Sequence, residues 1–260
     1  MIVLGLLAAC DPMPEAIPDE PGSFSSVDDL DRLLAVANPD NLVALYIFAT
    51  SLDYWPDPAC PAVEDAADIV YVEGGDCTDM YGGTWHGEAK ITSYDKREIE
   101  ATGFGVTLPD AAVTRYGEDT QSLTWLLDGK YAWFTEDGIQ RFETQLAVDF
   151  TDERDSFVAW VEVDGELVAS DGFPTLPSAS GTVGLERWGT AELALEDAAS
   201  GWFSDCPYPS GGSVTLSADN EASLDLGTPE PLCAPCPTVT LDGEVVELCE
   251  PWFHLQIPGF

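Results

Sequence analysis

The sequence predicts an all-β fold: an antiparallel meander that forms a sandwich or a barrel-like sheet, with one short N-terminal helix and a disulfide-stapled C-terminal segment. Two observations predict it. Apolar and polar residues alternate with a period of two along most of the chain after residue 77, as in half-buried strands. The strand-like runs also follow one another at the short spacing of a meander, without the alternating helices of a βαβ fold. Doubly wound nucleotide-binding folds are therefore excluded, and neither a glycine-rich phosphate loop nor a nucleophile elbow occurs in the sequence.

Composition indicates a folded and strongly acidic domain. A chain of 260 residues with 45% hydrophobic residues can bury a sizeable core, and we expect a single β-rich domain over 26–260. The net charge of −39 repels phosphate backbones, so nucleic acid is not expected as a partner, whereas cations are natural ones. Two explanations of this charge stay open: a saline habitat, or the solubility that excess carboxylate gives to a secreted protein.

The first residues indicate export. Residues 1–9 are apolar or small, and this run is too short to span a bilayer as a helix. Its end, Leu7-Ala8-Ala9-Cys10, resembles the bacterial lipobox, whose cysteine receives diacylglycerol and becomes the new N-terminus. An export signal usually begins with Lys or Arg, but neither precedes this run. A start codon chosen too late would explain the difference. The alternative is a buried first strand over 1–9, with Cys10 as an ordinary thiol.

Residues 10–25 are expected to form a lipid-anchored tether. Four prolines fall among residues 11–23, and a segment of this composition stays extended and solvated. The expected partner is therefore the lipid bilayer, through an acyl anchor on Cys10. This places the protein in the cell envelope, on the periplasmic face or at the cell surface.

One helix and one early buried strand are expected next. Apolar residues recur at helical spacing over 27–37, behind a Ser26 cap. Asn38 and Pro39 should end this helix, since asparagine tolerates a left-handed cap and proline cannot continue the ladder. The run over 42–50 is apolar on both alternations, which predicts a strand buried on two faces.

The rest of the chain reads as strands joined by tight turns. We expect two-residue hairpins at Asp128-Gly129, Asp164-Gly165 and Asp242-Gly243, and a β-bulge at Gly103-Phe104, where the alternation changes phase. The expected strands span 85–92, 99–108, 123–127, 131–135, 142–150, 157–163, 166–169, 182–188, 190–195, 213–218, 222–226, 238–241, 244–248 and 252–257.

Seven cysteines fit an oxidising compartment. If Cys10 is acylated, six cysteines remain, an even number that suits three disulfides. Cys60 and Cys77 enclose a short loop and are expected to pair. Four more would form two bridges in one of three pairings that the sequence leaves open: Cys206, Cys233, Cys236 and Cys249.

The Cys233-Ala-Pro-Cys236 motif allows two other chemistries. It matches a redox dithiol, and with Cys206 and Cys249 it could form a zinc site. A redox motif opens a helix, however, and residues 237–248 read as a hairpin instead. The cysteine thiols of an exported chain are also oxidised before they encounter free metal ions. Disulfides are therefore preferred, and no cofactor or metal is expected.

Few residues are candidates for catalysis or ligand binding. The only histidines, His86 and His254, are expected on polar strand faces as solvated side chains, and adjacent acidic pairs are expected at turns. No calcium motif occurs, although loop sites near 53–57 or 76–79 are considered. Four strand aromatics could form a sugar-stacking platform but are expected in the core: Trp125, Tyr131, Trp133 and Trp160.

Two parts of the chain resemble uncharacterised myxobacterial lipoproteins. In the C-terminal half, Cys206 is followed by Gly-Ser-Val-Thr-Leu-Ser at 212–217, Ala-Ser-Leu-Asp-Leu-Gly at 222–227, Cys233-x-x-Cys236, Thr-Leu-Asp-Gly at 240–243 and Cys249. In the N-terminal half, Gly-Asp-Cys-Thr-Asp at 75–79 precedes Gly-Thr-Trp-x-Gly at 83–87. The resemblance implies export and a β-rich fold, and it transfers no functional residue.

The sequence thus predicts an exported, lipid-anchored envelope protein that serves as a binding or structural module, since no catalytic constellation is recognisable in it. Two alternatives stay open. One is a secreted hydrolase that acts on glycan or peptide through acidic residues. The other is a calcium-binding surface protein.

Overall fold

The computed structural model describes residues 17–51, 59–109, 122–151, 156–170, 173–199, 211–227 and 238–247. Two consecutive helices, α1 (Val27–Ala37) and α2 (Pro39–Ser51), precede the strands. The strands are β1 (Ala62–Ala66), β2 (Ile69–Glu73), β3 (Cys77–Thr78), β4 (Thr84–Ser93), β5 (Arg97–Leu108), β6 (Leu123–Glu136), β7 (Ile139–Thr151), β8 (Ser156–Ser170), β9 (Phe173–Leu185), β10 (Gly189–Ala199), β11 (Ser213–Ser217), β12 (Glu221–Asp225), β13 (Thr238–Leu241) and β14 (Glu244–Glu247).

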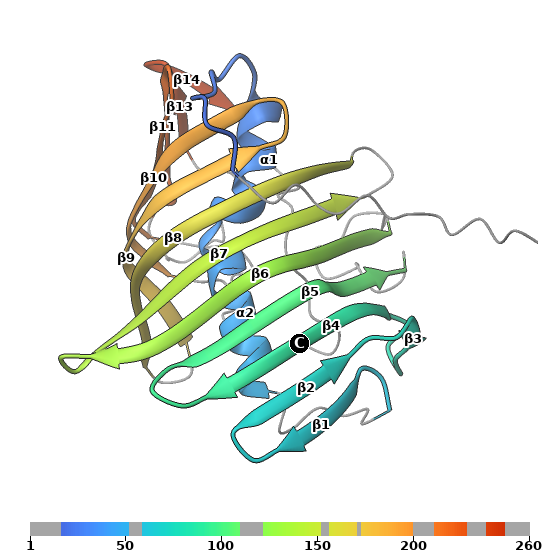
Figure 1. Ribbon diagram of the computed structural model, residues 1–260. Coiled ribbons are helices and arrows are strands. Elements are labelled where there is room, and N and C mark those ends of the chain that lie inside the picture. The colour runs from blue at the N-terminus through green and yellow to red at the C-terminus, as the bar shows by residue number, and fades with distance from the viewer. Residues whose placement is uncertain are drawn as a thin grey trace, which may run out of the picture.

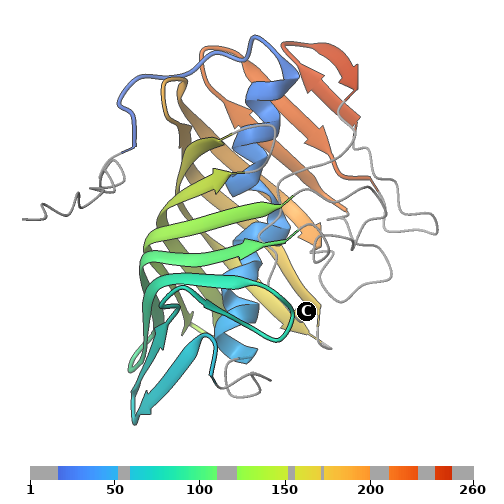
Figure 2. The same ribbon diagram turned by 90° about the vertical axis from the view of Figure 1, so that its right-hand side faces the viewer.

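All described strands belong to one antiparallel sheet. Its order follows the chain from β1 to β14, apart from β3, which pairs only with β4. The sheet curves around the two helices, which run along its concave side (Figures 1 and 2). The predicted antiparallel meander is therefore confirmed. Instead of two packed sheets, the described strands form a single open sheet, whose edges are β1 and β14.

The core lies between the concave face and the helices. Phe48 of α2 stacks on Trp85 of β4, with ring centroids 5.7 Å apart, and lies 5.5 Å from Phe104 of β5. The Arg97 guanidinium donates a hydrogen bond to the Ala49 carbonyl near the end of α2 (2.9 Å), where the helix dipole favours a cation. The alternation of the strands thus places one apolar face against the helices and leaves an outer face that is largely polar.

The strand expected over 42–50 is wrong, because these residues belong to α2. The Asn38 side chain accepts a hydrogen bond from the Asp40 amide (2.8 Å), and Pro39 occupies the first helical position. Asn38 itself is extended rather than left-handed (φ −65°), so it caps the start of the second helix. A helix surrounded by core is apolar on every side, as a doubly buried strand would also be.

Two of the three expected hairpins are also wrong. Asp128-Gly129 and Asp164-Gly165 lie inside the continuous strands β6 and β8, whereas the turn between β6 and β7 is Asp137-Gly138. The turn at Asp242-Gly243 is confirmed between β13 and β14. The bulge at Gly103-Phe104 is confirmed by a register shift between β5 and β6. There, the Asp128 carboxylate accepts a hydrogen bond from the Gly103 amide (3.0 Å), so Asp128 stabilises the bulge.

The described end of the expected tether is extended but docked on the sheet. The Thr190 amide donates to the Glu20 carbonyl (2.9 Å), and the Gly22 amide donates to the Thr190 carbonyl (2.8 Å). Phe24 is buried, and the Asn220 side chain bonds both its amide and its carbonyl. The expectation of a solvated linker is thus wrong for Glu20 to Phe24, which we call the strap. Cys10 and the expected signal at 1–9 lie outside the described residues.

Candidate functional site

Several candidates from the sequence take structural positions. Trp125, Tyr131, Trp133 and Trp160 are all buried, so they form no exposed platform. The expected place in the core is confirmed for Trp125, Tyr131 and Trp133, whereas Trp160 is buried outside the core cluster. Burial raises the pKa of the Tyr131 hydroxyl. The candidates His254, Cys206, Cys233, Cys236, Cys249 and the loop at 53–57 lie outside the described residues.

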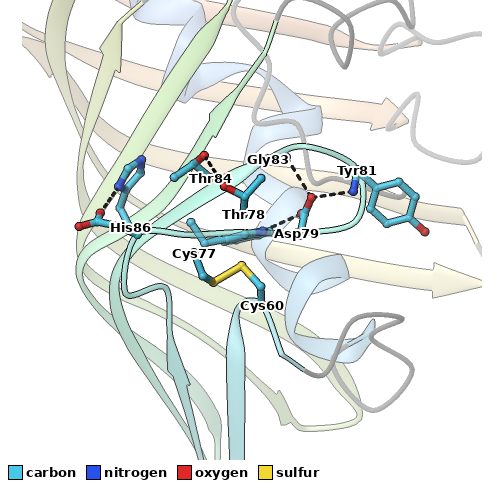
Figure 3. The surroundings of a disulfide bond; sticks show 10 residues. Cys60, Cys77, Thr78, Asp79, Tyr81, Gly83, Thr84 and His86 are labelled. Atoms are coloured by element: carbon cyan, nitrogen blue, oxygen red, sulfur yellow. Dashed lines mark hydrogen bonds and ion pairs between the residues drawn. A yellow bond between two sulfur atoms is a disulfide. The ribbon is translucent and has the colours of Figure 1, made fainter.

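The expected disulfide between Cys60 and Cys77 is confirmed. It joins Cys60, two residues before β1, to the first residue of β3, across a sequence separation of 17 (Figure 3). Cys60 is buried and Cys77 is half-buried. The bridge therefore fixes the short strand β3 beside β4, at one end of the sheet.

Asp79 organises the turn that follows β3. One carboxylate oxygen accepts hydrogen bonds from the Tyr81 amide (2.8 Å) and the Gly83 amide (2.9 Å), and the other accepts the Trp85 indole N–H (2.8 Å) (Figure 3). Asp79 is buried, with 6% of its surface exposed. Both oxygens thus face N–H donors, which argues against calcium binding by the loop at 76–79.

His86 is more than a solvated surface residue, because both ring nitrogens have partners. Nδ1 lies 2.7 Å from an Asp76 carboxylate oxygen, and Nε2 lies 2.9 Å from the Thr107 hydroxyl. The Thr107 hydroxyl in turn lies 2.9 Å from the Thr124 hydroxyl. We call these four residues the relay. They come from β4, β5, β6 and the turn before β3, and the side chain of His86 is only 28% exposed.

A row of hydroxyls continues the relay along the outer face. Thr107 pairs with Thr84 on one side and with Thr124 on the other, so these residues lie at the same level of neighbouring strands. In the next cross-strand pair, the hydroxyl oxygens of Thr151 and Ser156 lie 3.0 Å apart. The row lies toward the ends of the strands, away from the β6–β7 turn.

The other half of the outer face, near the β6–β7 turn, contains a charged hollow of about 480 Å³. Three basic side chains line it, Lys96, Lys130 and Arg141, although the whole chain has only nine Lys and Arg residues. Glu162 and Asp164 of β8 line it as well, and neither forms an ion pair with a described residue.

Ion pairs organise the basic side of the charged hollow. The Glu98 carboxylate lies 3.1 Å from the Lys96 ammonium and 3.4 Å from that of Lys130. Burial alone would raise the pKa of Glu98, but the hydrogen bonds and charges of the two lysines lower it. The hydrogen bond that Lys96 donates to Glu98 raises the pKa of Lys96, and the charge of Glu98 raises the pKa of Lys130. Both ammonium groups therefore stay charged, and about half of each lysine side chain is exposed.

Two outer-face carboxyl groups away from the charged hollow resist ionisation. Burial raises the pKa of Asp128, although the Gly103 amide opposes this. Burial also raises the pKa of Asp149, and the charge of Glu186 adds to the effect. Within the described residues, no group of three or more His, Cys, Asp or Glu side chains could hold a metal ion.

The comparisons give no relative for this chain: no protein-family model matches it, and no curated protein or solved structure is significantly similar to it. Residues 27–50 are long and apolar enough to cross a membrane, but 88% of their most apolar window is buried inside the protein. Such burial is expected of a core helix.

Sequence reasoning missed the relay and the charged hollow. The alternation of β4 places His86 and Lys90 on the polar face, as expected. The neighbours of His86, however, follow from the register of β4, β5 and β6 and from the position of Asp76 beside a disulfide. Pairing the two cysteines was the available signal, because it brings residues 76–79 next to β4.

Proposed function

We propose that this protein is an exported, lipid-anchored binding protein of the cell envelope, and that the charged hollow on its outer face binds a short zwitterionic peptide. The observation that carries the proposal is the arrangement of the hollow. It has exposed ammonium groups on one side and, on the other, carboxylates that form no ion pair with a described residue. The lipid anchor rests on the lipobox at Cys10, and the export on the cysteines.

The strap supports an anchored orientation. The first described contact of the strap with the sheet is at Glu20, ten residues after Cys10. Ten extended residues span at most about 35 Å, so an acyl group on Cys10 would keep the sheet within about that distance of the bilayer. The disulfide between Cys60 and Cys77 suits the oxidising compartment that such an anchor implies.

The charges of the hollow favour a ligand with two opposite ends. Lys130 pairs with Gln145, and Gln145 pairs with Glu162, so the cationic and anionic sides are two strand spacings apart, about 10 Å. An extended peptide of about three residues has its two termini at a similar separation. Its carboxylate would face Lys130 and Lys96, and its ammonium group would face Glu162 and Asp164. The volume of about 480 Å³ lies in the range of small-molecule sites.

Calorimetric titration of the full chain with zwitterionic trialanine tests the ligand, with acetylated and amidated trialanine as the control. We expect binding only of the peptide with free termini. Lys130→Met should weaken binding at least tenfold, whereas Lys90→Met should leave it unchanged, because Lys90 lies on the same face outside the hollow. Equal binding of free and blocked peptides, or no binding of either, would remove the proposed ligand.

Mass spectrometry of the native protein from membranes tests the anchor. We expect a diacylglycerol-modified Cys10 at the N-terminus, and a protein released into the soluble fraction by Cys10→Ser. An unprocessed Met1 with a free Cys10 thiol would contradict both the anchor and the envelope location.

A further inference from the structure

The relay of Asp76, His86, Thr107 and Thr124 has the arrangement of an activated hydroxyl nucleophile. A general base lies within hydrogen-bond reach of a hydroxyl, at 2.9 Å, and a carboxylate at 2.7 Å orients the base from its other nitrogen. Such a site is identified by geometry and roles, independently of the order of residues in the chain. We propose that Thr107 is the nucleophile of an acyl-transfer site that cleaves carboxylic esters, an activity separate from peptide binding in the charged hollow.

The hydrogen bonds allow the proton positions that this chemistry needs. An ionised Asp76 can only accept, so the proton of a neutral His86 lies on Nδ1, and Nε2 presents a lone pair to Thr107. The Thr107 hydroxyl then donates to Nε2 and accepts from the Thr124 hydroxyl. All three contacts are satisfied in this arrangement, and it directs the base at the Thr107 hydroxyl.

The local backbone holds the relay in place. Asp76 has a positive φ (56°), a conformation that a residue other than glycine adopts at a cost, and it directly precedes the disulfide-bonded Cys77. His86 lies at a register shift between β4 and β5, beside Gly87 (φ 59°). A Cβ atom at Gly87 would lie 2.1 Å from the Gly103 carbonyl oxygen, so the two strands approach closely only because Gly87 has no side chain. A bulge of this kind redirects the side chain next to it.

The expected reaction has two steps. The Thr107 oxygen attacks the ester carbonyl, its proton passes to His86 Nε2, and the bond from the acyl carbon to the alcohol oxygen breaks as His86 returns that proton to the leaving alcohol. A water molecule then attacks the acyl carbon and gives a proton to His86 Nε2. The bond from the acyl carbon to the Thr107 oxygen breaks, His86 returns the proton to that oxygen, and the carboxylic acid leaves. Asp76 acts as a positioning residue, and it stabilises the imidazolium that forms in each step.

The experiment uses the full chain with p-nitrophenyl acetate and a fluorophosphonate probe. We expect a burst of p-nitrophenol and a covalent adduct that mass mapping assigns to Thr107. Thr107→Val and His86→Gln should lower the acylation rate by about 10²-fold or more, while Thr107→Ser should retain activity. Thr84→Val is the matched control, because its hydroxyl lies in the same row but bonds Thr78 instead of the relay.

Asp76→Asn should slow acylation by about 10²-fold or more, yet leave the final extent of labelling and the melting midpoint unchanged, which a merely structural residue would not do. The proposal is overturned if folded wild-type protein shows neither adduct nor turnover above buffer. It is also overturned if Thr107→Val retains wild-type acylation, or if the adduct maps to another residue.

Discussion

Removal of the Asp79 carboxylate should unfold the disulfide end of the sheet more easily than any change to an exposed acidic residue. Asp79 accepts three N–H donors, and two of these bonds, from the Gly83 amide and the Trp85 indole, are buried. A buried donor that loses its acceptor costs about 1–3 kcal/mol. Asp79→Ala should therefore lower the free energy of unfolding by about 2–6 kcal/mol, with the partly exposed Tyr81 amide adding little.

Asp79→Asn tests the contributions of the two carboxylate oxygens separately. The oxygen that accepts the two backbone amides is retained, whereas the new NH₂ group opposes the Trp85 N–H, so the expected loss is about 1–3 kcal/mol. In the Trp85→Phe background no indole donor is present, and Asp79→Asn should then cost close to nothing. Urea unfolding of the four proteins measures the coupling, which we expect at about 1–3 kcal/mol.

Asp95→Ala is the matched control. Asp95 is an exposed carboxylate in the β4–β5 turn, so its removal should change the free energy of unfolding by less than about 0.5 kcal/mol. If Asp79→Ala were as mild as Asp95→Ala, the three hydrogen bonds would contribute nothing to stability. An equal cost of Asp79→Asn with and without the indole would show that Trp85 is not its partner.

Three further changes have defined outcomes. Replacing Cys60 and Cys77 together by Ala opens a loop closed across 17 residues and should lower the free energy of unfolding by about 3 kcal/mol; a urea midpoint that dithiothreitol leaves unchanged in the wild type would contradict this. Asn38→Ala removes the cap of α2 and should cost about 1 kcal/mol in thermal melts, whereas Asn38→Asp should cost much less. Because the folded pKa of Glu98 is lowered, its ion pairs contribute stability above the unfolded pKa of about 4.3, and this is lost as pH falls through the folded pKa. Glu98→Gln should thus destabilise at pH 7 but not at pH 2, and an equal loss at both would refute the assignment.

The sequence predicted the first helix correctly but misassigned the segment after it. Asn38 and Pro39 predict the end of a helix, but with Asp40 they also begin one, with a capping side chain, a proline at the first position and an acid in the first turn. A continuous apolar run of this length cannot distinguish a helix surrounded by core from a doubly buried strand. Only the packing of Phe48 against Trp85 and Phe104 decides between them.

The Asp-Gly pairs show a second limit of local signals. Asp242-Gly243 and Asp137-Gly138 form hairpins in which both residues have positive φ. Asp128-Gly129 does not turn, because it lies opposite the bulge of β5, where the Asp128 carboxylate binds the Gly103 amide. The sequence located that bulge at Gly103 but could not show that the next strand supports it. Whether an Asp-Gly pair forms a hairpin turn depends on the neighbouring strand, which local sequence does not specify.

The faces of the strands were predictable, whereas the neighbours of each side chain were not. The alternation around Trp85 places His86 on the outer face, but a register shift lies between His86 and Glu88. The extra residue of this shift lies in β5, and beyond it Thr107 pairs with Thr84 while its hydroxyl contacts the His86 ring. Without the bulge, Thr107 would lie on the inner face of β5, in phase with the buried Ile99 and Ala101, since one extra residue inverts the alternation of a strand. The relay thus depends on a backbone irregularity whose sequence signs are two glycines, Gly87 and Gly103, and whose consequence emerges only when β4 and β5 are paired.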